Sequence, residues 1–87
     1  MAAVVCSPEF PAWDCQWALR TVWCESRNQP DAVGHEVYKG ADWYFVGWWQ
    51  IASPHVDPGL FDPWENTRQA YGKFLSGGIG HWPYCGR

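Results

Sequence analysis

Hydrophobic and polar positions repeat with a helical period over two segments of this chain, and the first runs from about residue 13 to residue 27. It contains no proline or glycine, while Pro11 precedes it and Pro30 follows it. At about 100° per residue, its polar and apolar side chains fall on opposite sides. The polar side holds Gln16, Arg20 and Arg27, and the apolar side holds Ala18, Leu19 and Val22. We therefore predict an amphipathic helix here, with Asp14 near its start.

The second helical segment begins at Asp62 and ends at Gly77-Gly78. Asp62, Pro63 and Glu65 provide an N-cap, a proline at the first helical position and a carboxylate at the third, which is a capping-box arrangement. Glycine is typical of a helix end. The expected apolar face of this second helix is Trp64, Thr67, Tyr71, Phe74 and Leu75. Its expected polar face is Glu65, Gln69, Lys73 and Ser76.

Between these helices, residues 31–63 are rich in glycine, proline and aromatic residues and contain only short apolar runs. Residues 37–38 and 43–46 fit two short strands, with Gly40 in the turn between them. Residues 48–52 fit either a strand or a short helix, because so short an apolar run is ambiguous. The tail, residues 80–87, is rich in aromatic residues. We expect Trp82, Tyr84 and Cys85 to pack back against the body of the protein.

The expected fold class is therefore α+β, mainly α, in one domain that spans residues 1–87. A chain of 87 residues has little interior, because a domain of this size buries only about 60–65% of its unfolded surface. The eight tryptophans, four tyrosines and four phenylalanines offset this small size, because each large ring buries much apolar surface.

Four cysteines are a second source of stability. No two of them form a C-x-x-C pair and none has a histidine at zinc-finger spacing, which favours disulfides over a metal site. Disulfides indicate an oxidising compartment. Four cysteines permit three pairings, and sequence alone does not choose among them. We favour Cys6–Cys15, which closes a short local loop, together with Cys24–Cys85, which ties the tail to the first helix.

The net charge is −3, with 6 basic and 9 acidic residues, so the chain lacks the basic surface of a nucleic-acid binder. No apolar run approaches membrane-spanning length, and no basic amphipathic helix fits a membrane-active peptide. Met1 to Val5 is too short for a signal peptide. We expect a trimmed chain, a domain of a larger exported protein or a phage protein released by lysis, monomeric if it stands alone, with no metal and no cofactor.

Glu25 is the polar residue that falls on the apolar side of its helix, away from the arginines. Burying an unpaired carboxylate costs free energy, and the helix C-terminus adds partial negative charge, so both effects favour the protonated form. A carboxyl group that keeps its proton near neutral pH is what glycosidic cleavage needs, because the leaving oxygen must be protonated. The alternative from helix phase alone is an ion pair with Arg20, Arg27 or Lys39.

Three segments carry motifs in a fixed order: residues 25–33 (ESRNQPDAV), residues 47–51 (GWWQI) and residues 60–66 (LFDPWEN). They resemble the E-S-x-x-x-P-x-A-V, G-L-M-Q-I and L-F-D-P-x-x-N motifs of lytic-transglycosylase domains in the lysozyme-like superfamily. The resemblance spans about residues 24 to 71. It implies a lysozyme-like fold, in a minimal version stapled by two disulfides, and it implies that Glu25 is the catalytic acid.

The resemblance also implies roles for neighbouring residues. Ser26 would help to orient the site, and Gln50 would hydrogen-bond amide or hydroxyl groups of the substrate. Trp48 or Trp49 would form an apolar wall along the sugar faces. The structural alternatives are a serine bonded to a helix carbonyl, an amide bonded to backbone, and two tryptophans in the core.

One position departs from the family pattern. The family usually has a tyrosine seven residues after the asparagine of its last motif, close to the catalytic glutamate, and this chain has Lys73 there. Tyr71 faces the core by helix phase and is the better candidate, with ordinary core packing as its alternative. The chain is also shorter than most relatives, so some helices that build the cleft are missing or come from a partner. His35, His55 and His81 are scattered, and we interpret them as surface or packing residues.

The implied activity is cleavage of the β-1,4 bond between N-acetylmuramic acid and N-acetylglucosamine in bacterial peptidoglycan. Animal-type lysozymes place a second carboxylate where this chain has Phe45, so a lone acid favours the transglycosylase route, in which the substrate's own hydroxyl attacks and an anhydro sugar forms. Hydrolysis, with Asp42 or Asp31 steering water, stays open. The expected partner is the glycan strand, outside the cell, at the cell wall or on a virion. A non-catalytic glycan-binding or virion structural domain is the alternative.

Overall fold

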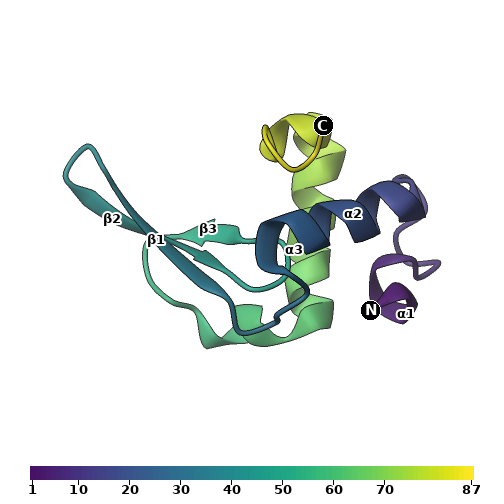
Figure 1. The fold of residues 1–87 in the computed structure, drawn as a ribbon, viewed down its shortest axis with the longest axis horizontal. Coiled ribbons are helices and arrows are strands. Elements are labelled where there is room, and N and C mark those ends of the chain that lie inside the picture. The colour runs from purple at the N-terminus through teal and green to yellow at the C-terminus, as the bar shows by residue number, and fades with distance from the viewer.

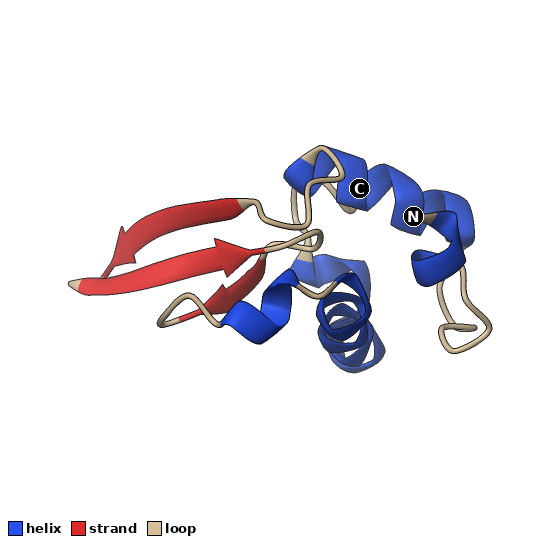
Figure 2. Cartoon of the chain, turned by 90° about the horizontal axis from the view of Figure 1, so that it is seen from below, coloured by secondary structure: helices blue, strands red, loops and turns tan.

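The protein is a small α+β fold of three α-helices and a three-stranded antiparallel sheet, here in a computed structural model that describes all 87 residues. The sheet projects to one side of the helices, and both termini lie on the helical side (Figures 1 and 2). In chain order the elements are α1 (Ala2–Val5), α2 (Cys15–Ser26), β1 (Val33–Tyr38), β2 (Ala41–Val46), β3 (Ile51–Ser53), the 3-10 helix η1 (Pro58–Phe61), α3 (Pro63–Gly77) and the 3-10 helix η2 (Gly78–His81).

Helix α2 confirms the first predicted helix, although it starts two residues later and ends one residue earlier than predicted. The carboxylate of Asp14 caps it by accepting a hydrogen bond from the Trp17 backbone N–H at 2.9 Å. The helix ends because Arg27 and Asn28 both adopt positive φ, of 53° and 63°. Glu25 therefore lies in the last helical turn, immediately before the chain reverses toward the sheet.

The two predicted strands are present but longer, as β1 and β2. Lys39 and Gly40 have φ of 52° and 78°, which is the two-residue turn that suits the twist of a hairpin. Strand β1 is exposed along most of its length, so its residues carry little of the hydrophobic alternation from which a strand is read. Residues 48–52 resolve into a turn followed by the short strand β3, which pairs with β2.

Helix α3 confirms the second predicted helix, but only half of the predicted capping box forms. Asp62 accepts a hydrogen bond from the Trp64 backbone N–H at 3.0 Å. Glu65 does not return to the N-cap; its carboxylate instead accepts from Gln69 at 3.2 Å and lies 3.7 Å from Arg68. The predicted apolar face is also too long, because Leu75 is 63% exposed near the end of the helix.

The core is built from indole rings. Trp13 and Trp49 stack with ring centroids 4.6 Å apart, and the rings of Trp17 and Trp82 pack against the same cluster. Each of these rings also places its N–H on an acceptor, such as the carbonyl of Gly86 for Trp17. Because both the apolar surface and the N–H groups are satisfied, a short chain obtains a well-filled interior.

Two disulfides, Cys6–Cys15 and Cys24–Cys85, complete the fold, in the pairing that the sequence favoured. The first joins the N-terminal segment to the start of α2, and the second joins the end of α2 to the C-terminal tail. Trp82 in that tail is buried, as expected, but Tyr84 is 83% exposed and does not pack into the core. No helix is both long and apolar enough to cross a membrane.

Candidate active site

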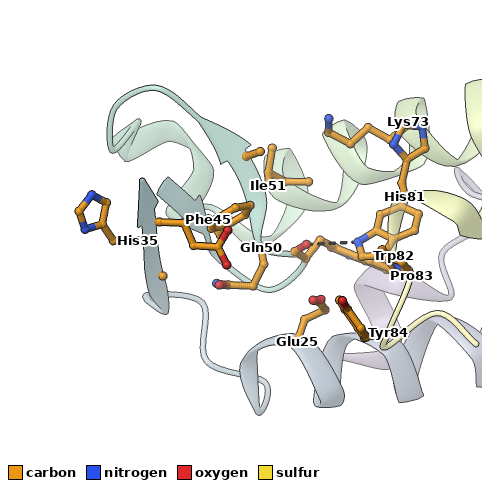
Figure 3. A pocket seen from close by; sticks show the side chains of 14 residues that line it. Glu25, His35, Phe45, Gln50, Ile51, Lys73, His81, Trp82, Pro83 and Tyr84 are labelled. Carbon is orange, nitrogen blue, oxygen red and sulfur yellow. Dashed lines mark hydrogen bonds between the residues drawn. The ribbon is translucent and has the colours of Figure 1, made fainter. Parts of the chain in front are cut away.

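A cavity of about 650 Å³ opens between the end of α2, the sheet and the end of α3 with the C-terminal tail (Figure 3). Helix α2 contributes Glu25, and the sheet contributes residues from all three strands, including Glu36 and Phe45. The rest of the lining comes from α3 and the tail, which supply Lys73 and Tyr84. Segments far apart in sequence therefore meet around one acidic side chain.

Glu25 points into this cavity and is half-buried (Figure 3). It takes part in none of the ion pairs of the protein. Two of the three cations considered from the sequence are engaged elsewhere: Arg27 donates to the Trp23 carbonyl at 3.2 Å, and the ammonium of Lys39 lies over the ring of Tyr38. The alternative in which Glu25 is neutralised by an ion pair is therefore wrong.

Burial raises the pKa of the Glu25 carboxyl above its ordinary value of 4.5, because the charged form loses hydration. No nearby cation opposes that effect. A carboxyl group with a raised pKa that lines an open cavity holds its proton closer to neutral pH than an ordinary glutamate does. It is therefore suited to act as a general acid.

Glu36 is a second carboxylate that lines the cavity. Strand β1 carries it two residues after Gly34, which lines the cavity as well, and that spacing puts both on one face of the strand. Asp42 lies outside the cavity, 59% exposed, with its carboxylate 2.8 Å from Nε2 of His35. Asp31 is exposed in a turn and also lies outside. The second carboxylate that lines the cavity is thus Glu36, and not Asp42 or Asp31.

Gln50 lines the cavity from the turn that precedes β3. Its backbone has a φ of 50°, and its side-chain Nε2 donates to the carbonyls of Ala32 at 3.2 Å and Gly47 at 3.1 Å. The amide nitrogen is thus occupied in holding the turn, which is the structural alternative that the sequence allowed. The oxygen Oε1, which lies toward Gly34, is the part of this side chain that remains for a ligand.

Trp49 lines the cavity, whereas Trp48 and Ser26 lie outside it. Trp49 is fully buried, and its indole N–H donates to Thr67 Oγ1 at 3.2 Å. Trp48 is a core residue whose N–H donates to the Asn28 carbonyl. The Ser26 hydroxyl is buried and donates to the Val22 carbonyl at 3.1 Å. Neither Trp48 nor Ser26 therefore lies where the resemblance implied.

The structure places Lys73, and not the expected Tyr71, at the cavity. Tyr71 packs against Phe10 and Trp13 in the core, and its hydroxyl accepts a hydrogen bond from the Ala12 backbone N–H at 2.9 Å. It does not line the cavity, whereas Lys73 does. The position seven residues after Asn66 therefore faces the cavity, with lysine in place of the family's tyrosine.

The cavity also includes tail residues that the sequence did not single out as site residues, among them His81 and Tyr84. Cys24 precedes Glu25 and Cys85 follows Tyr84, so the Cys24–Cys85 disulfide places Tyr84 on the same side of the cavity as Glu25 (Figure 3). Adjacency to paired cysteines was the one sequence signal for this juxtaposition. His35 of β1 is also a lining residue, but its ring stacks on Tyr44 and points away from Glu25 (Figure 3).

No protein-family model, curated protein or solved structure matches this chain in the comparisons made. The likeness to lysozyme-like domains therefore rests on the three motifs. No group of three or more histidine, cysteine, aspartate or glutamate side chains is arranged to hold a metal ion.

Proposed function

We propose that this protein cleaves the β-1,4 glycosidic bond between N-acetylmuramic acid and N-acetylglucosamine in peptidoglycan, with Glu25 as the general acid and then the base. The observation that carries the proposal is a half-buried, unpaired glutamate with a raised pKa at the wall of an open cavity. The motif resemblance supports it independently. Two disulfides are compatible with work in an oxidising compartment, where peptidoglycan is found.

In the reaction we favour, the Glu25 carboxyl gives its proton to the leaving oxygen as the bond from C1 of the muramic acid to that oxygen breaks. A hydroxyl of the same sugar then forms a bond to C1 and passes its proton to the Glu25 carboxylate. The product ends in an anhydro sugar, and no water is consumed. Glu25 returns to its protonated form, so one carboxyl group is sufficient for the cycle.

The fold supports this chemistry by fixing the backbone on two sides of the cavity. On the helical side, Asp14 caps α2 and the Cys24–Cys85 disulfide binds its last turn to the tail. On the sheet side, Gln50 holds the turn beside the cavity. A general acid is effective only when it is held within reach of the leaving oxygen, so this support matters for rate.

The direct test is clearing of a suspension of bacterial walls by the parent protein and by Glu25→Gln, which removes the acid while preserving size. We expect the variant to lose clearing by a factor of at least about 100, the usual contribution of a general acid. Asp31→Asn is the matched control, because it removes an exposed carboxylate outside the cavity. Equal clearing by parent and Glu25→Gln, with both folded, contradicts the proposal.

Mass spectrometry of the released fragments separates the two possible reactions. Anhydro ends are expected from the lone-acid route, whereas reducing ends indicate hydrolysis. The second candidate function is glycan binding without cleavage, which is favoured by the exposed ring of Tyr84 beside the cavity. It predicts that parent and Glu25→Gln bind walls equally and that neither releases fragments.

A further inference from the structure

Acidic and basic side chains line different parts of the cavity. Glu25 and Glu36 come from α2 and β1, while Lys73 and His81 come from α3 and η2. Figure 3 shows Lys73 and His81 together at one end of the cavity, on the side away from Glu25. A ligand that filled the cavity would therefore meet an acidic side and a basic side.

Lys73 is available to a ligand. It takes part in none of the ion pairs of the protein. The carboxylate of Glu65 on the same helix is occupied by Arg68 and Gln69. The raised pKa of Glu25 has burial as its cause and no opposing cation, so Lys73 does not serve to hold Glu25 ionised. The ammonium group of Lys73 thus has no role within the protein that explains its place in the cavity.

The lack of a side chain at Gly77 leaves the space that the His81 ring occupies. The imidazole ring lies so close to Gly77 that a Cβ atom there would be 2.8 Å from Cδ2 and closer still to Nε2. Gly77 has a φ of −140°, which any residue can adopt, so the backbone does not demand glycine at this position. The ring also meets Trp82 edge to face, with centroids 6.1 Å apart. Glycine at the end of α3 therefore allows the imidazole to lie at the cavity wall.

We propose that Lys73 and His81 form a subsite for a carboxylate that hangs from the glycan strand. The proposal rests on the proposed function, because it names which form of the glycan fits. An ammonium group and an imidazole N–H are donors, and charge-assisted hydrogen bonds to a carboxylate are about twice as strong as neutral ones. Chitin-type glycans carry no such group. Peptidoglycan carries carboxylates on its peptide stems, or on the lactyl group of each muramic acid once the stems are removed.

The test measures binding in the Glu25→Gln background, so that no substrate is consumed. Three probes are compared by calorimetry: a neutral chitin oligosaccharide, glycan strands with peptide stems, and strands stripped of their stems. Lys73→Met, which keeps length and removes charge, is set against Lys39→Met, which removes a lysine from the hairpin turn outside the cavity. His81→Gln and the charge-preserving Lys73→Arg complete the set, each checked for an unchanged melting temperature.

We expect Lys73→Met to weaken binding of a carboxylate-bearing strand about tenfold, the effect of one hydrogen bond to a charged group, and to leave chitin binding within about twofold. Lys73→Arg should retain binding. Loss confined to stem-bearing strands identifies the stem carboxylates, and loss confined to stripped strands identifies the lactyl carboxylate. Equal weakening of all three probes, no weakening, or no glycan binding at all overturns the subsite.

The subsite and the proposed function fail in distinguishable ways. If the parent does not clear walls but Lys73→Met still selectively weakens the binding of carboxylate-bearing strands, the subsite stands and the catalytic proposal falls. If walls are cleared and Glu25→Gln abolishes clearing, but the charge of Lys73 does not affect which glycan binds, the catalytic proposal stands and the subsite falls.

Discussion

The side-chain amide of Asn66 occupies the space that a Cβ atom on Gly47 would need. Asn66 is fully buried on α3, and its Oδ1 accepts a hydrogen bond from the Trp49 backbone N–H at 2.9 Å. Its Nδ2 donates to the carbonyls of Val46 at 2.8 Å and Leu60 at 2.9 Å. One asparagine therefore attaches the turn before β3 to the helix, and Gly47 is the residue that lets it approach.

Replacing Gly47 with alanine should destabilise the protein by about 3 kcal/mol, the sum of a strained positive φ and an overpacked core. Gly40 is a matched control, because it has the same φ of 78° but open space where its Cβ would be. Gly40→Ala should cost only the backbone strain, about 1 kcal/mol. Urea unfolding of both variants measures the difference, and equal losses would show that the contact with Asn66 is not tight.

Part of the fold and of the candidate site could be predicted from the sequence. Helix phase placed Glu25 inward, and the structure confirms it, because the two helices have a clear 3.6-residue period. Phase alone misplaced Lys73, since its apolar stem lets a lysine on the flank of a helix line a cavity. Glu36 was missed because β1 is an exposed strand, in which hydrophobic alternation is weak. Tyr84 was expected to pack because aromatic residues usually do, but the disulfide fixes the tail without burying that ring.

Activity should fall as pH rises through the raised pKa of Glu25, because only the protonated carboxyl can serve the leaving group. The alkaline limb of the pH profile for wall clearing should therefore lie above the ordinary glutamate value of 4.5. The measurement is the initial rate of clearing across pH, at constant ionic strength. A rate that falls as soon as pH exceeds about 4.5, like an exposed glutamate, would contradict the assignment of the acid.

Stability should respond to the same group. Because the pKa of Glu25 is higher in the folded than in the unfolded state, its favourable contribution is complete below about pH 4.5 and is lost as pH rises through the folded pKa. Glu25→Gln does not titrate, so its melting temperature should gain on that of the parent as pH rises. Melting curves of the two proteins at about pH 4 and about pH 8 test the sign, and a variant whose melting temperature falls relative to that of the parent between these pH values would refute it.

Glu36→Gln tests whether the second carboxylate of the cavity takes part in the reaction. If Glu25 alone gives and takes the proton, clearing by Glu36→Gln should stay within about tenfold of the parent, well short of the 100-fold or greater loss of a general acid or base. The fragments should keep their anhydro ends. Loss of clearing together with reducing ends in the parent would instead make Glu36 the group that activates water.

Removing each disulfide in turn should lower the free energy of unfolding in both cases but reduce wall clearing in only one. By loop entropy, breaking Cys24–Cys85, whose partners lie 61 residues apart, costs about 4 kcal/mol, and breaking Cys6–Cys15, whose partners lie 9 apart, costs about 2.5 kcal/mol. Paired cysteine-to-alanine variants give these values by urea unfolding. At temperatures where both remain folded, only the loss of Cys24–Cys85 should reduce wall clearing, because that bond alone adjoins Glu25. Equal loss of clearing in both would contradict a local role.

The Cys24–Cys85 bond also makes the two sides of the cavity mechanically unequal. Glu25 and Tyr84 belong to segments that are joined covalently by this bond, so the two segments cannot move apart without breaking it. The hairpin side is held only by non-covalent contacts, which are the three-stranded sheet and the hydrogen bonds of the Gln50 and Asn66 side chains. A thick or cross-linked polymer entering the cavity would therefore displace β1 and β2, while the acid and the tail keep their spacing.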